Sequence, residues 1–358
     1  MPSEQMPLLP RLIAACVLIS GVSVFADELP LTSDDLRPAI QKSLPLLMKA
    51  AVGHRENRDC FACHNQGIPI LALTAAGTRG FDVDMNELGI QQKAIVEFLA
   101  SNREEYLRGE GQGGKVDTAG YALTTLEAAG WKADETTAAV TEYLLLTERD
   151  LDHWLNTSRR PPSEATPFTT TYVALRSLSA YGTPDQQRRI DDRRAEVLGW
   201  LLRTPPGDSE ERVFRLLGLK AAGAQVDIVS AAAKDLTAAQ QDDGGWSQLD
   251  AGEPETAVRS DAYATGTALV ALQLAGELQP SDAVIQRGLR YLLKTQQDDG
   301  SWHVISRSKP FQTYFETGFP HGKDQFISCS ASAWATLAMV NAVEPVAPPP
   351  PRAVPLDD

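Results

Sequence analysis

One short pattern recurs along this chain and limits the folds that are open to it. In five places a run of small and apolar residues at helical spacing ends in a glycine, and these glycines follow one another at intervals of 41 to 53 residues: Gly77, Gly130, Gly182, Gly223 and Gly276. A sixth copy, residues 333–341, lacks the glycine. Because glycine readily adopts the left-handed conformation that ends a helix, each copy predicts the last turns of one helix.

A second kind of helix is predicted around these copies. Its members are charged and amphipathic, and they cover residues 35–51, 90–99, 136–149, 185–203, 228–240 and 284–296. A helix with one polar face belongs at a surface, whereas an apolar helix rich in small residues belongs inside. The alternation therefore predicts an all-α fold, an α/α toroid of six inner and six outer helices. Residues 27–344 are expected to form this single domain.

Two glutamine-tryptophan motifs sharpen the fold prediction. Residues 240–246 read Gln-Gln-Asp-Asp-Gly-Gly-Trp, residues 296–302 read Gln-Gln-Asp-Asp-Gly-Ser-Trp, and a degenerate third copy ends at Trp154. With these motifs the chain resembles the squalene-hopene cyclase and protein prenyltransferase superfamily over most of residues 67–343. The resemblance implies the toroid fold and a structural role for the motif: the amides would bond neighbouring helix ends, and the indole would pack on the next outer helix.

The catalytic signatures of that superfamily do not carry over with the fold. The triterpene cyclases use a clustered Asp-x-Asp-Asp acid, but the most similar segment here, residues 258–263, contains Asp261 alone. The zinc prenyltransferases use Asp, Cys and His from equivalent helices. Here Tyr263 stands where the cysteine is wanted, and Ile327 lies in the region that should supply the histidine. The resemblance therefore predicts the fold and names no catalyst.

Residues 60–64 read Cys-Phe-Ala-Cys-His, the pattern by which c-type haem is attached to proteins. The thiols of Cys60 and Cys63 would add to the haem vinyl groups, and His64 would be an axial iron ligand. We therefore predict covalent haem c as the cofactor. Two alternatives are an oxidised pair of the same cysteines and a zinc ion, for which His54 and His64 would join the two thiolates.

The connections that lead from outer to inner helices open at one rim of a toroid, and every histidine of the chain falls in one of them. If the ring closes, the loop 298–327 lies against the turn 60–64, where its aromatic residues would cover a porphyrin. His321 is the candidate for the second axial ligand, and an open sixth position is the alternative. His303 is expected to be a packed loop residue, and Cys329 a buried thiol.

Residues 12–25 form an apolar run behind Arg11, and small residues precede Asp27. This layout predicts a cleaved signal peptide over residues 1–26 and a periplasmic or secreted protein, with lipid attachment at Cys16 as the alternative. The run is too short for a comfortable membrane span, and no later segment is predicted to be one. Residues 345–358 contain four consecutive prolines and predict a disordered tail.

The formal net charge of -14 argues against nucleic acids and anionic lipids as partners. The main functional prediction is an exported c-type haem protein that serves electron transfer or haem redox chemistry with a redox partner protein. One alternative is a terpene cyclase-like or prenyltransferase-like enzyme that acts on an apolar, isoprenoid-type small molecule in the toroid cavity. The other is a protein-binding module with a disulfide between Cys60 and Cys63.

Overall fold

The computed structural model describes residues 29–249, 259–310 and 313–345. The predicted signal peptide lies outside the described residues, as does the predicted tail apart from its first residue. The described residues from Leu31 onward belong to one compact unit. Within them, we find no helix that is both long enough and apolar enough to cross a bilayer.

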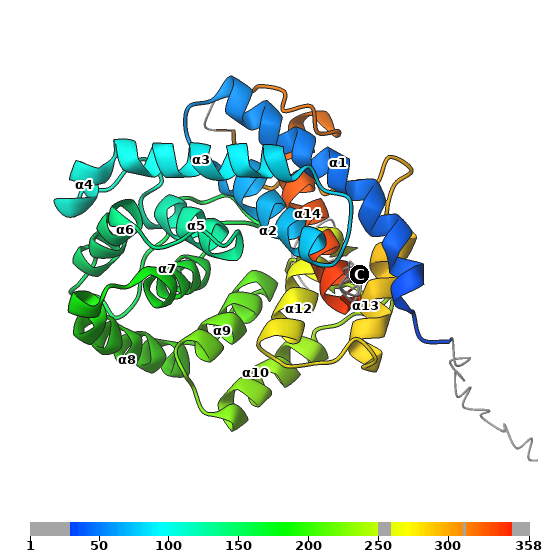
Figure 1. Ribbon diagram of the computed structural model, residues 1–358. Helices are drawn as coiled ribbons and strands as arrows, with labels where there is room; N and C mark the ends of the chain where they lie inside the picture. The colour runs from blue at the N-terminus through cyan, green and yellow to red at the C-terminus, as the bar shows by residue number, and fades with distance from the viewer. Residues whose placement is uncertain (1–28, 250–258, 311–312, 346–358) are drawn as a thin grey trace, which may run out of the picture. The chain divides into compact units, whose positions relative to one another are not determined.

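Six inner helices form a closed ring in the described part of the chain, which confirms the toroid prediction (Figure 1). Each inner helix packs against the next, and the last packs against the first. The apolar, small-residue character of the repeats explains this burial: nearly every side chain of the final two inner helices is inaccessible to solvent. The inner helices are α2 (Ile68–Thr78), α5 (Lys115–Ala128), α7 (Pro167–Tyr181), α9 (Ser209–Ala221), α12 (Ala262–Leu274) and α14 (Gln325–Ala342).

Amphipathic helices surround this ring (Figure 1). In the last of them, Ile285, Leu289 and Leu292 recur at helical spacing on the buried face, while the opposite face is polar. The outer helices are α1 (Ser33–Asn57), α3 (Met85–Ser101) with its short continuation α4 (Arg103–Leu107), α6 (Glu135–Leu146), α8 (Gln187–Arg203), α10 (Val226–Ala238) and α13 (Ala283–Thr295).

The remaining elements are short. They are the π-helix η1 (Cys63–Gly67), the 3-10 helices η2 (Pro184–Gln186) and η3 (Gly322–Asp324), and two strands of two residues each, β1 (Trp246–Ser247) and β2 (Ser260–Asp261). The strands pair antiparallel, with Trp246 opposite Asp261. This pairing joins the glutamine-tryptophan motif at residues 240–246 to the start of α12.

The three motif tryptophans, Trp154, Trp246 and Trp302, occupy equivalent places in the ring. Each indole is fully buried, and each Nε1 donates to the carbonyl oxygen ten residues earlier, near the end of the preceding outer helix, at 2.8 to 3.0 Å. Each backbone N–H donates to a hydroxyl of the following inner helix. The indole therefore bonds to the preceding outer helix, whereas the resemblance implied packing on the next outer helix. The degenerate copy at Trp154 is structurally equivalent to the other two.

The motif glutamines join each outer helix to the next. The side chain of Gln240 donates to the carbonyl of Val284 on α13, and that of Gln296 donates to the carbonyl of Ala39 on α1, both at 2.9 Å. The second bond links the last outer helix to the first. Gly300 makes this approach possible, because its φ is +94° and a Cβ atom there would lie 2.4 Å from the carbonyl oxygen of Lys42.

Candidate functional site

Ionisable side chains are buried inside the ring near the N-terminal ends of the inner helices. The chain enters every inner helix from an outer one, so these ends gather at one rim. Five side chains there, each at most 5% exposed, come from η1, α5, the loop before α7, α9 and α12. We call them the interior cluster: Cys63, Tyr121, Glu164, Glu210 and Tyr263.

Glu210 is the carboxyl group of the interior cluster whose neutral form is favoured. Its Oε1 accepts a hydrogen bond from Thr169 at 3.0 Å, and its Oε2 lies 3.1 Å from the hydroxyl of Tyr263. Burial, followed by the charge of Asp208, raises the pKa of Glu210 well above its usual value, although the group lies in the first turn of a helix.

Glu164 is the charged carboxyl group of the same cluster. Burial raises its pKa, but the nearby His64 and the charge of Arg160 outweigh burial, and the net shift is downward. The Arg160 guanidinium lies 3.1 Å from Oε2, and Nδ1 of His64 lies 3.9 Å from Oε1. Two buried glutamates of one cluster are thus pushed toward opposite protonation states, an arrangement typical of acid-base sites.

The two tyrosines complete the interior cluster with phenol groups that stay protonated. Burial is the main cause that raises the pKa of both Tyr121 and Tyr263 well above the usual value, and nearby Glu210 and Glu164 add to it. The hydroxyl of Tyr121 is buried and has no hydrogen-bond partner among the described residues. An unsatisfied buried hydroxyl is unusual and marks a position where a ligand group could bind.

A small cavity of about 10 Å³ adjoins Glu210 and Tyr263. Pro162 and Arg307, from two loops at the rim, also line it. A space of this size holds roughly one water molecule. Any larger ligand must therefore move these loop residues aside.

Two other acids near this rim, the buried Asp117 and the half-buried Asp261, accept structural hydrogen bonds, although Oδ2 of Asp261 has no partner among the described residues. Asp261 caps α12, because its Oδ1 accepts from the backbone N–H groups of Tyr263 and Ala264 at 2.8 and 3.0 Å. Asp117 holds the loop before α7, since its Oδ2 accepts from the N–H groups of Thr157 and Ser158, both at 3.0 Å. Burial raises the pKa of each aspartate to about 6.

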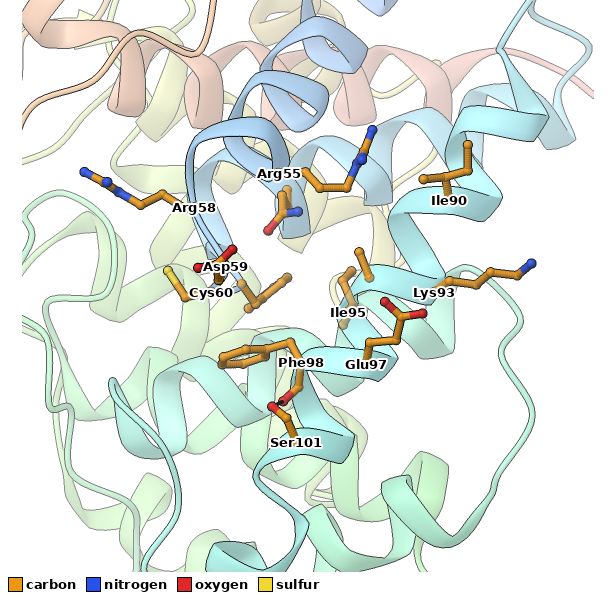
Figure 2. A pocket seen from close by; sticks show the side chains of 13 residues that line it. Arg55, Arg58, Asp59, Cys60, Ile90, Lys93, Ile95, Glu97, Phe98 and Ser101 are labelled. Atoms are coloured by element: carbon orange, nitrogen blue, oxygen red, sulfur yellow. Dashed lines mark hydrogen bonds between the residues drawn. The ribbon is translucent and has the colours of Figure 1, made fainter.

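The two cysteines of the 60–64 turn face different surroundings. Cys60 is exposed and lines a surface groove of about 500 Å³ between the end of α1 and α3, where Figure 2 shows it on the side facing Phe98. Cys63 is buried at 3% exposure beside Glu164, and burial raises its thiol pKa well above the usual value. Both are free thiols, as is the buried Cys329.

The loop that was expected to lie against this turn does so. Phe315 packs on His54 with ring centroids 5.7 Å apart, and Phe326 packs edge-on against His64 at 5.5 Å. His321, however, stacks on His303 at 4.6 Å and shares a hydrogen bond with Ser301. The structure therefore brings the aromatic residues of the loop to the turn, while the imidazole of His321 is engaged elsewhere.

Glu164 and Glu210 were not recognised as candidates in the sequence. Glu210 follows Asp208 and precedes Glu211, so it reads as an ordinary acid of a first helical turn. Glu164 lies in an irregular loop, with a φ of +51°. The only available signal was the place of Glu164 in a connection to an inner helix, which the histidines were expected to share.

Comparison with known proteins supports the toroid fold. No curated protein matches the chain significantly. Residues 212–327 match the squalene-hopene cyclase C-terminal domain. The type II terpene cyclase MstE from Scytonema has a similar structure, with a TM-score of 0.55 and 14% identity, covering 87% of this chain and 99% of that one.

Two further structures give the same result. A variant of MstE in complex with its product, merosterolic acid A, has a TM-score of 0.56 at 13% identity, covering 87% of this chain and 97% of that one. A protein from Actinoplanes has a TM-score of 0.53 at 15% identity, covering 86% and 99%. Identities this low establish a common fold.

The predictions of covalent haem c and of haem redox function are wrong. The similar structures include type II terpene cyclases, and the described residues contain no group of three or more His, Cys, Asp or Glu side chains placed to hold a metal ion. Cys60 faces the surface groove while Cys63 is buried beside Glu164, so the thiols do not present one common side to a porphyrin. The predicted redox partner protein depended on the haem, so that prediction has no support either. The chain instead has an α/α toroid fold similar to that of the terpene cyclase MstE, and its residues 212–327 match the squalene-hopene cyclase C-terminal domain.

Proposed function

We propose that this protein is an enzyme of the type II terpene cyclase kind, which cyclises an apolar isoprenoid chain inside its helical ring. The observation that carries the proposal is the interior cluster, in which a carboxyl group with a raised pKa and one with a lowered pKa lie buried together at one rim of a closed ring. A carboxylic acid that is shielded from water can protonate a double bond, because no solvent competes for the proton or the resulting cation.

The reaction needs no oxidant. A proton adds to one carbon of a double bond, the π electrons form the new C–H bond, and the adjacent carbon becomes cationic. A second double bond of the same chain attacks this cation and closes a ring, and loss of a proton ends the sequence. The product is an isomer of the substrate, with the same mass.

Other residues of the interior cluster could stabilise the carbocation that forms during cyclisation. The aromatic faces of Tyr121 and Tyr263 attract positive charge through the ring quadrupole. The carboxylate of Glu164 supplies a fixed negative charge in a water-excluded site, where electrostatic stabilisation is strong. An isoprenoid occupies far more than the cavity beside Glu210, so binding requires the loops that carry Pro162 and Arg307 to open.

The similar structures suggest which substrates to test. MstE has been seen with geranylgeranyl dihydroxybenzoate as substrate and with merosterolic acid A as product. We propose a substrate of the same broad class for this chain, an isoprenoid chain with or without an aromatic head. We also propose that residues 1–26 direct export, so that the active protein begins at Asp27.

The test is an incubation of purified residues 27–358 with geranylgeranyl dihydroxybenzoate, geranylgeraniol and squalene, followed by mass spectrometry. The expected result is a new compound with the mass of the substrate and fewer double bonds by NMR. Heat-denatured protein is the negative control, and MstE with its own substrate is the positive control. Recovery of every substrate unchanged, in an assay where MstE is active, would refute the proposal.

A further inference from the structure

We infer that Glu210 is the proton donor of this ring. The inference rests on the proposed function and deepens it, because it names the group that starts the reaction. The segment most similar to the acid motif of the triterpene cyclases contains Asp261 alone, and the donor proposed here lies on a different inner helix.

The first argument is position. Glu210 lines the small cavity, whereas Asp117 and Asp261, which also carry raised pKa values, are not among its lining residues. A proton donor has to reach the reacting carbon, so it must face the space in which the substrate lies.

The second argument is the state of the oxygens. Asp261 uses Oδ1 to cap α12, and Asp117 accepts hydrogen bonds on both of its oxygens. Bonds from backbone N–H groups favour the carboxylate, because an N–H donates to it and cannot accept from a protonated acid. The partners of Glu210 are two hydroxyl groups, those of Thr169 and Tyr263, and a hydroxyl can donate to the carboxylate or accept from the protonated acid. Glu210 can therefore keep its partners in both protonation states.

The third argument is the unsatisfied phenol nearby. The hydroxyl of Tyr121 is buried and unpartnered among the residues that the structure describes, and Tyr263 and Glu210 are its near neighbours. A buried polar atom without a partner points to a site that is completed on binding.

The proton step balances within this site. The O–H bond of Glu210 breaks, a C–H bond forms on the substrate and Glu210 becomes a carboxylate. The proton lost at the end of cyclisation returns to that carboxylate, directly or through solvent. Tyr263 is a positioning residue in this step, since it holds Oε2 of Glu210 by one hydrogen bond.

The decisive experiment compares three variants with the wild type on a substrate that the wild type cyclises. Glu210→Gln removes the proton and should lower turnover by about 100-fold or more, the usual contribution of a general acid. Asp261→Asn keeps a side-chain oxygen for the helix cap and should stay within a few-fold of wild type. Glu211→Gln, one residue along the same helix, is the matched control and should also stay close to wild type.

A second readout separates proton donation from a structural role. Activity should fall as pH rises through the pKa of Glu210. In Glu210→Asp this fall in activity should occur at lower pH, since aspartate has the lower ordinary pKa. Infrared difference spectra at neutral pH should show the carbonyl band of a protonated acid in wild type that Glu210→Gln lacks. This measurement needs no substrate.

The outcomes distinguish the two proposals. If wild type cyclises a substrate and Glu210→Gln is equally active, or if Asp261→Asn is the variant that loses activity, Glu210 is not the donor while the cyclase proposal stands. Absence of the protonated carbonyl band overturns the assignment even if Glu210→Gln does not fold. If wild type is inactive on every isoprenoid, the proposed function fails, and the donor role falls with it.

Discussion

The hydroxyl of Tyr263 lies 3.1 Å from Oε2 of Glu210, so one hydrogen bond joins the first turns of two neighbouring inner helices, α9 and α12. Both side chains are at most 5% exposed, and no bulk water can replace a lost partner. The bond therefore contributes to ring stability and also fixes the orientation of the acid.

Tyr263→Phe should lower the free energy of unfolding by about 1 kcal/mol, the usual net value of a buried hydrogen bond. Cyclisation should slow as well, because Glu210 loses one of its two orienting hydroxyls. Chemical denaturation and steady-state kinetics measure the two effects. Tyr314→Phe, at a tyrosine that is 44% exposed, is the control and should change neither by a comparable amount. An unchanged Tyr263→Phe protein would show that the bond has no role.

Trp246→Phe should destabilise the ring by about 1–3 kcal/mol, because the carbonyl of Leu236 loses the buried indole donor and keeps only the 3.3 Å bond from the backbone N–H of Ala239. The matched control is Trp131→Phe. The Nε1 of Trp131 donates to the exposed Asp134 at 2.9 Å, where water can replace it, so the loss should be smaller. Thermal unfolding of both variants tests the difference. Equal losses would mean that the motif tryptophans act by volume alone.

Gly300→Ala should destabilise the protein by about 2–4 kcal/mol, since the new methyl group meets the carbonyl oxygen of Lys42 and the φ of +94° disfavours a side chain. Gly89→Ala is the control. A Cβ at Gly89 meets nothing within 4 Å, and alanine there should be neutral or stabilise α3 by up to about 1 kcal/mol. Denaturant midpoints for the two variants would decide whether closure of the outer ring depends on this contact.

His54 should make stability depend on pH between about 4 and 6.5. Burial, partly offset by the hydrogen bond to the carbonyl of Cys60, lowers the pKa of His54 from 6.5 to about 4. The unfolded state therefore binds the proton first as pH falls. Stability present above pH 6.5 is lost progressively down to pH 4, by about 3 kcal/mol in total.

The variant His54→Gln should flatten this part of the stability profile relative to wild type. Comparing the two proteins at each pH removes the contribution of the raised carboxyl pKa values of Asp117 and Asp261, which act in the opposite direction. Chemical denaturation at several pH values gives the profile. Parallel curves for the two proteins would show that His54 keeps an ordinary pKa.

Mature protein without residues 1–26 should show one fast-reacting thiol. Cys60 is exposed, whereas Cys63 and Cys329 are buried and burial raises the pKa of both. A coloured thiol reagent should count one cysteine in native protein and three after unfolding in urea. Cys60→Ser should abolish the fast reaction. A fast reaction that persists in this variant would place another thiol at the surface.

The sequence by itself determined the ring. Its evidence was local and periodic: apolar helices that end in glycine alternate with amphipathic helices, and the same glutamine-tryptophan motif recurs at equivalent places. Helix type follows from the spacing of apolar residues within a few turns, so the sequence alone was enough. Ring closure also placed the loop 298–327 against the turn 60–64, as the contact between Phe326 and His64 confirms.

The tertiary structure alone decided the site. Residues 60–64 have the spacing of a haem motif, but the direction of each thiol depends on what packs against the turn, and Cys63 lies beside Glu164 from a loop a hundred residues away. Glu210 looks like any acid in a first helical turn until the ring closes over it. Burial is a property of the whole ring, and burial is what raises the pKa of Glu210 and turns an ordinary glutamate into a candidate proton donor.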